Sequence, residues 1–218
     1  MKRRTLDILF SIGGIGLAGL LLVIGVVMTS NANFSKRYVT DQLKQEKITF
    51  KTADTLTDEE RQADCLVRYA GQALTTGKQA ECYANQFIGL HVKTTANGLT
   101  YAEIGDVQTS LRAQIATAQK NNDPGVADLQ KQLADLTTQR ETVFKGETLR
   151  GILLTSYGFS VLGTKASQAA TVIYMGVILL TLLSIAGFVH AFVTPKSKAF
   201  ASPTPQETAT ANPEAVSV

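Results

Sequence analysis

Two uncharged apolar runs lie near opposite ends of this chain of 218 residues. The first, Ile8 to Met28, holds about 21 residues without an ionisable side chain, enough for a helix to cross the roughly 30 Å hydrocarbon core of a bilayer. The second, Ala169 to Val193, contains one ionisable residue, His190, close enough to its end to lie at the membrane interface. The two runs predict two transmembrane helices, and every other segment must fold around them.

The basic residues at the outer ends of the two runs predict the topology. They are Lys2, Arg3, Arg4, Lys196 and Lys198. Positive charge is retained on the cytoplasmic side, so we expect residues 1–7 and 194–218 in the cytoplasm and residues 29–168 outside the plasma membrane. A small-residue cleavage site ending at Ala32 leaves removal of the first run as an alternative, although signal peptides have shorter apolar regions of roughly 7–15 residues.

Small residues crowd the cytoplasmic half of both runs and predict close helix packing. They let backbones approach in lipid, where packing replaces the hydrophobic driving force. The two runs packing on each other, or the glycine face docking on another subunit, would both explain them. The residues are Gly13, Gly14, Gly16, Ala18 and Gly19 in the first run and Ser184, Ala186 and Gly187 in the second.

The middle of the chain carries helix-start signals and few aromatic residues, so it predicts an extracytoplasmic helical bundle. Thr57 with Glu60, and Thr100 with Glu103, have the spacing of a capping box. A helix is expected from Asp58 to about Tyr69, and Asn33–Gln45 should continue the first span. The expected fold is therefore an all-α membrane protein with two transmembrane helices flanking this bundle.

A long antiparallel helical hairpin is expected at about residues 101–145. An apolar residue recurs every three or four positions on both sides of a break at Asn121–Gly125. Arg140 lies on the apolar stripe, so we expect it to form an ion pair with Asp106 or Glu103 across the hairpin.

Two further segments are assigned by length and composition. Residues 151–163 are apolar but too short to cross a bilayer, so they are expected as a core helix that closes the bundle before the second span, or as a helix resting on the outer membrane surface. Residues 194–218 are rich in Pro, Thr and Ala without apolar periodicity, which is typical of disorder.

Cys65 and Cys82 are the only cysteines, and both lie in the part expected outside the cytoplasm, where disulfides form. They flank a bend between Gly71 and Gly77, so folding the chain there places them opposite one another. We expect a structural disulfide that closes about 18 residues, since redox enzymes use a much closer pair of cysteines.

The sequence carries no pattern of catalytic, cofactor-binding or metal-ligating residues. His91 is the only histidine outside the spans, and Asp58–Glu60 has the acidic character that a helix N-terminus favours. Of the 21 Lys and Arg residues, five are the topology signals, which leaves no basic patch for nucleic acid.

The segment from Tyr69 to Ile88 resembles an uncharacterised family of actinobacterial two-span membrane proteins. Those proteins share the layout of basic start, span, exported helical domain, span and Pro-rich tail. Some carry an automatic label of aromatic ring-opening dioxygenase, which implies a histidine-rich iron site that this sequence lacks. The resemblance implies no known activity.

Two functions follow as expectations. The first is a non-enzymatic envelope protein, set in the lipid bilayer, whose exported helical domain and spans dock on another membrane or envelope protein or on a second copy. The alternative is an extracytoplasmic sensor or small-ligand-binding module that relays its signal through a partner, because the predicted cytoplasmic part is too short for an output domain. An enzyme is the least expected, since no convergent titratable groups are visible.

Overall fold

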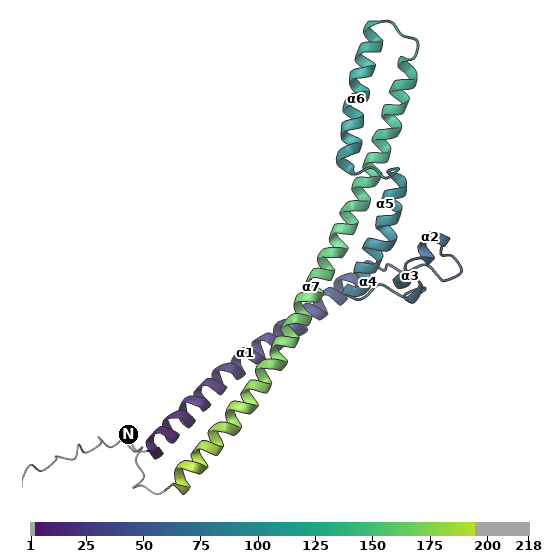
Figure 1. Ribbon diagram of the computed structural model, residues 1–218. Helices are drawn as coiled ribbons and strands as arrows, with labels where there is room; N and C mark the ends of the chain where they lie inside the picture. The colour runs from purple at the N-terminus through teal and green to yellow at the C-terminus, as the bar shows by residue number, and fades with distance from the viewer. Residues whose placement is uncertain (1–2, 195–218) are drawn as a thin grey trace, which may run out of the picture. The chain divides into compact units, whose positions relative to one another are not determined.

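A computed structural model describes residues 3–194, and the cytoplasmic tail expected at 194–218 lies almost wholly outside them. Within that range the chain is all-α and has no strand, as the sequence predicts (Figure 1). The elements are α1 (Arg3–Gln45), α2 (Asp58–Arg61), α3 (Asp64–Arg68), α4 (Gly77–Cys82), the π-helix η1 (Tyr83–Ile88), α5 (Gly89–Thr95), α6 (Tyr101–Lys120) and α7 (Val126–Val193).

The helices α1 and α7 are both long and apolar enough to cross a membrane. They run through both of the compact units into which the chain divides. We call residues 3–26 and 170–194 the apolar unit and residues 27–169 the central unit. Each is described separately below.

Residues 151–163 are helical, as expected of a core helix, but this helix does not end before the second apolar run, because the segment is a continuous part of α7. No proline interrupts residues 126–193, so nothing in the backbone forces the helix to stop. Leu153 is buried in the core of the central unit, which gives this stretch of α7 its own packing partners.

In the apolar unit α1 and α7 approach each other closely at small residues. A side chain at Gly14 would collide with the Ser184 hydroxyl, and one at Gly187 would collide with the Ser11 hydroxyl. Gly25 makes room for the ring of Tyr174, which would lie 2.8 Å from an added Cβ. These contacts need glycine because a larger residue would separate the two backbones.

The core of the central unit forms where the short helices pack on α1 and α7. Its largest fully buried aliphatic side chains include Leu66 from α3, Leu74 from the loop before α4, and Leu153 from α7. Val39 and Leu43 bring α1 into the same cluster. The long helices thus supply a wall on which the short ones bury their apolar residues.

The chain between α1 and α4 is held by local signals. Thr57 and Glu60 form the predicted capping box at the start of α2. The expected helix to Tyr69 is instead broken after α2, because Ala63 adopts an extended conformation. This break allows α3 to bury Leu66 while Cys65 bonds to Cys82.

The predicted hairpin is formed by α6 and the first part of α7, which lie antiparallel (Figure 1). Thr100 and Glu103 form the predicted capping box of α6. At the turn the Asp123 carboxylate accepts a hydrogen bond of 2.7 Å from the Gly125 amide. Ile104, an apolar residue in the first turn of α6, is fully buried.

Candidate functional site

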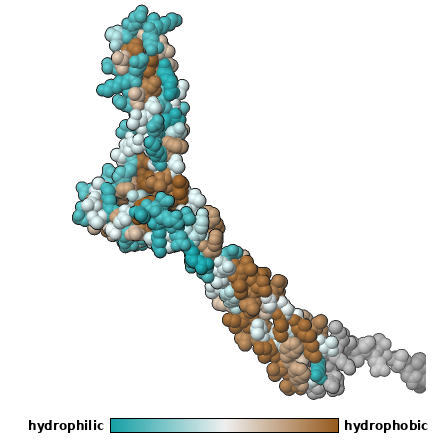
Figure 2. Space-filling view, turned by 180° about the vertical axis from the view of Figure 1, so that it is seen from behind, coloured by the Kyte–Doolittle hydropathy of each residue, from teal (hydrophilic) through white to brown (hydrophobic). Residues whose placement is uncertain are grey.

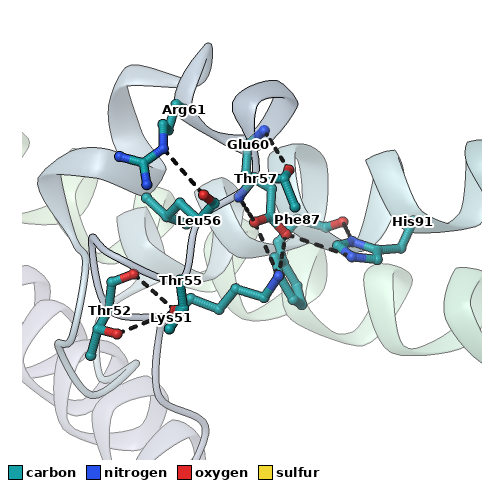
Figure 3. A network of polar contacts seen from close by, with 9 residues as sticks. All are labelled: Lys51, Thr52, Thr55, Leu56, Thr57, Glu60, Arg61, Phe87 and His91. Carbon is teal, nitrogen blue, oxygen red and sulfur yellow. Dashed lines mark hydrogen bonds and ion pairs between the residues drawn. The ribbon is translucent and has the colours of Figure 1, made fainter.

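A buried carboxylate, Glu60, is the centre of the polar network in Figure 3. Its side chain is 0% exposed. The Lys51 ammonium donates to both carboxylate oxygens at 2.8 and 3.0 Å, and the Thr57 amide donates to Oε2 at 2.8 Å. The Nε2 atom of His91 lies 3.6 Å from Oε1. The Glu60 carboxylate thus joins residues 51 and 57, which precede α2, to residue 91 in α5.

The partners of Glu60 keep it ionised. Burial alone would raise the pKa of the Glu60 carboxyl, because a low-dielectric environment disfavours charge. Hydrogen bonds from Lys51 and Thr57, with the electrostatic interactions of Lys51 and His91, outweigh burial and hold that pKa below its usual value of 4.5. Because both oxygens are already engaged, Glu60 is suited to anchoring the fold rather than to transferring protons.

Aromatic rings extend the anchor from Glu60 into η1 and α5. The Lys51 ammonium lies 5.3 Å from the centre of the Phe87 ring, in cation–π geometry. The Phe87 ring in turn packs on His91 with centroids 4.4 Å apart, and His91 Nδ1 is 2.7 Å from the Phe87 carbonyl oxygen. His91 is thus fixed by its neighbours even though half of its side chain is exposed.

The two cysteines form the expected disulfide. Cys65 in α3 and Cys82 at the end of α4 have Cα atoms 6.0 Å apart, and no free cysteine is present in the described part of the chain. Loop closure of this length contributes about 3 kcal/mol by the chain-entropy estimate. The bond ties together two helices that are too short to be stable alone.

The expected ion pair of Arg140 with Asp106 or Glu103 is wrong: neither pair forms among residues 3–194. Arg140 Nη1 instead donates to Gln108 Oε1 at 3.0 Å, and its guanidinium lies 4.1 Å from the centre of the Tyr101 ring. Glu103 is already occupied, since its carboxylate accepts from the Thr100 amide in the capping box. A neutral amide and an aromatic face satisfy Arg140 in place of a carboxylate.

The small residues of the two apolar runs divide into two groups. Gly14, Ala18, Ser184 and Gly187 lie in or beside the α1–α7 contact, where Ala18 and Ser184 are buried. The second group consists of three glycines at which an added Cβ would meet no heavy atom within 4 Å. They are Gly13, Gly16 and Gly19.

One polar pair lies at the Asp7 end of the same helix contact. His190 Nδ1 is 2.9 Å from Asp7 Oδ2, and Arg4 lies 5.6 Å from the centre of the Phe192 ring. The sequence predicts an interfacial His190 but not its carboxylate partner, which lies 183 positions away along the chain.

An open groove of about 780 Å³ lies in the central unit where η1, α5, the start of α6 and α7 meet. Its wall holds the polar side chains Asn85, Lys93, Glu147 and Arg150 and the apolar side chains Leu99 and Tyr101. Sequence reasoning missed this site because its polar residues come from three separate elements.

No group of three or more His, Cys, Asp or Glu side chains that could hold a metal ion occurs in the part of the chain described here. Searches for related proteins find no matching family model, curated protein or solved structure. The site must therefore be interpreted from its own geometry.

Proposed function

We propose that this chain is a non-enzymatic integral protein of the plasma membrane, with both ends in the cytoplasm and residues 29–168 outside, that docks on another membrane or envelope protein. The observation that carries the proposal is uncovered apolar surface. In the most apolar 18-residue stretch of each helix, only 17% of α1 and 6% of α7 is buried by the rest of the chain. A core helix of a water-soluble protein would be covered by its own chain.

The exposed side chains on these helices are large and face outward all along the two runs, as the brown surface of Figure 2 illustrates. Lipid is the solvent in which such surface is stable. Examples from 58% to 75% exposed are Leu9, Phe10, Ile12, Leu20 and Val23 in α1 and Val172, Met175, Ile178, Leu182 and Phe192 in α7.

Two further observations support the proposed orientation. The disulfide between Cys65 and Cys82 suits an oxidising compartment, outside the cytoplasm. The basic residues at both outer ends of the runs suit the cytoplasmic side. We also propose the actinobacterial two-span family for this chain, on the sequence from Tyr69 to Ile88.

Docking through the spans is supported by the glycines that α7 leaves uncovered. Gly13, Gly16 and Gly19 recur every three residues on α1, with no described atom where a side chain would lie. A helix of a partner protein can approach closely along such a row. Gly14 differs from these three glycines, because it is required for the contact between α1 and α7 and is not free to pack on a partner.

The test extracts the tagged full chain in a mild detergent and measures what co-purifies at stoichiometric amount. We expect Gly16→Leu to lose the partner while keeping the α1–α7 contact, and Leu17→Ala, on an exposed side chain next to it, to keep both. Gly14→Leu should disturb the α1–α7 contact, because its side chain would collide with Ser184. A wild-type chain that purifies alone as a monomer, or a partner indifferent to Gly16→Leu, would contradict docking along this face.

A further inference from the structure

We propose that the groove between η1, α5, α6 and α7 binds a small organic anion, with the anionic group taken by Arg150 and the apolar body lying against Leu99 and Tyr101. The groove lies wholly within the central unit. The proposal therefore goes beyond membrane docking and does not depend on it.

The first argument is the state of Arg150 in the groove wall. Its Nη1 lies 3.2 and 3.4 Å from the two oxygens of Glu147, and its Nη2 lies 3.3 Å from Asn85 Oδ1. Charge-assisted hydrogen bonds are normally about 2.7–2.9 Å long, so all three contacts are weak. The Nε atom is buried and meets no acceptor. This guanidinium has donor capacity that the protein leaves poorly used.

The second argument is charge. The charged side chains that line the groove are Lys93, Arg150 and Glu147. Glu147 is the ion-pair partner of Arg150, while Lys93 forms no ion pair with any residue from 3 to 194. One positive charge is left over, and it favours an anion over a neutral or cationic ligand.

The third argument is shape. A volume of about 780 Å³ is within the range of small-molecule sites. The apolar wall includes Leu99, 37% exposed, and Tyr101, 41% exposed, which leaves surface for an apolar ligand body. A bare inorganic anion would leave this surface uncovered.

The fourth argument is the backbone that presents Asn85. This residue belongs to η1, a π-helix, and π-helical turns are rare and occur frequently at functional sites. Gly98, which precedes Leu99 and also lines the groove, has φ +83°, a backbone conformation that favours glycine. Two stretches of unusual backbone thus contribute to the lining of this groove.

The test titrates the purified full chain, in a neutral detergent at pH 7, with 4-phenylbutyrate as the probe anion, and measures heat of binding against a detergent blank. The neutral 4-phenylbutan-1-ol and inorganic phosphate are the comparison probes. We expect saturable binding of the phenylbutyrate, and weaker binding of the alcohol and of phosphate, because only the first probe has both the charge and the apolar body.

Three variants assign the binding to the groove. Arg150→Gln should weaken the affinity for phenylbutyrate about tenfold or more, the change expected for one hydrogen bond to a charged group. Lys93→Gln should weaken it about threefold, as expected for an exposed charge. Leu99→Ser should weaken the affinity for phenylbutyrate but not that for phosphate, because only phenylbutyrate has an apolar body that lies against the Leu99 side chain. Lys131→Gln, an exposed lysine of α7 that does not line the groove, is the matched control.

The proposal is overturned by an absence of saturable phenylbutyrate binding at millimolar concentration, by equal affinity for the alcohol, or by unchanged affinity in Arg150→Gln and Lys93→Gln. Should Arg150→Gln fail to fold, as judged by its thermal unfolding, the exposed Lys93 and Leu99 variants decide the question. Loss of the docking partner in the previous experiment would leave these affinities unchanged, so the two proposals fail separately.

Discussion

Glu60 has two structural tasks that use the same carboxylate. It closes the capping box of α2 through the Thr57 amide, and it holds the Lys51 ammonium inside the central unit. The second task depends on the first, because the cap fixes the carboxylate where Lys51 can reach it. Glu60, which the sequence identifies only as a capping residue, therefore also anchors the chain between α1 and α2.

Replacing Glu60 with Gln should lower the free energy of unfolding by about 2 kcal/mol, since Lys51 loses its charged acceptor while keeping partial access to water. Glu59→Gln, on an exposed neighbour in the same helix, should change it by less than about 0.5 kcal/mol. Urea unfolding of the full chain in detergent, followed by the near-UV circular dichroism of the tyrosines, measures both. Equal effects of the two substitutions would show that Glu60 is no anchor.

The lowered pKa of Glu60 also predicts a pH dependence. A carboxyl whose pKa is lower in the folded state stabilises the protein above the unfolded-state pKa, near 4.5, and this stabilisation is lost as the pH falls through the folded-state pKa. The unfolding midpoint should therefore fall steeply below about pH 4.5.

The variant Glu60→Gln should show a shallower fall in the same pH range. Some acid sensitivity should persist, because the hydrogen bond of the Thr100 amide also lowers the pKa of Glu103. Identical acid profiles for the wild type and the variant would mean that Glu60 has the same pKa in the folded and unfolded states.

At the scale of elements, the hairpin of α6 and α7 is held by a buried amide where the sequence predicts an ion pair. Gln108 is 2% exposed, accepts from Arg140 and donates to Thr137 at 2.9 Å. Asp106 has no such role. One polar link across this hairpin is therefore a chain of three residues through one glutamine.

Gln108→Ala should reduce the local stability of α6 by about 2 kcal/mol, because it removes two hydrogen bonds and leaves Arg140 without its amide acceptor. Asp106→Ala should change it by less than about 0.5 kcal/mol. Amide hydrogen exchange along α6 reports this local opening directly. A larger loss of protection in Asp106→Ala than in Gln108→Ala would contradict the Gln108 link and favour an ion pair between Arg140 and Asp106.

Local signals in the sequence are enough to predict much of the fold. The capping boxes at Thr57 and Thr100 and the hairpin turn at Asp123 each depend on residues within a few positions of one another. The same rule finds a third capping box, Thr76 with Gln79, which sequence reasoning overlooked although its spacing is identical.

Features that join distant residues are harder to predict. Glu60 with His91, Arg140 with Gln108, and Arg150 with Asn85 meet only after the helices pack, so no spacing rule identifies them. The cysteine pair is an exception, because only one pairing is possible and the proposed compartment favours it. The full length of α7 is not predicted, because its polar and apolar stretches are each typical of a separate helix, although no proline between them breaks the backbone.

At the scale of the whole molecule, the account depends on lipid around α1 and α7. Residues 8–28 and 169–193 expose large apolar side chains, while the central unit buries its own leucines. We therefore propose lipid around residues 8–28 and 169–193 and water around the central unit. The proposed docking partner, the orientation of the chain and the oxidising compartment of the disulfide all depend on placing these two apolar runs in a bilayer.

Labelling intact cells with a membrane-impermeant maleimide tests this placement most directly. Both native cysteines are bonded to each other, so each variant carries one reactive thiol, at Gln119→Cys on the exposed end of α6 or at Ser217→Cys in the tail, and the parent chain is the blank. We predict labelling of Gln119→Cys in intact cells and of Ser217→Cys only after the cells are permeabilised. Labelling of Ser217→Cys alone in intact cells would reverse the topology and contradict the account.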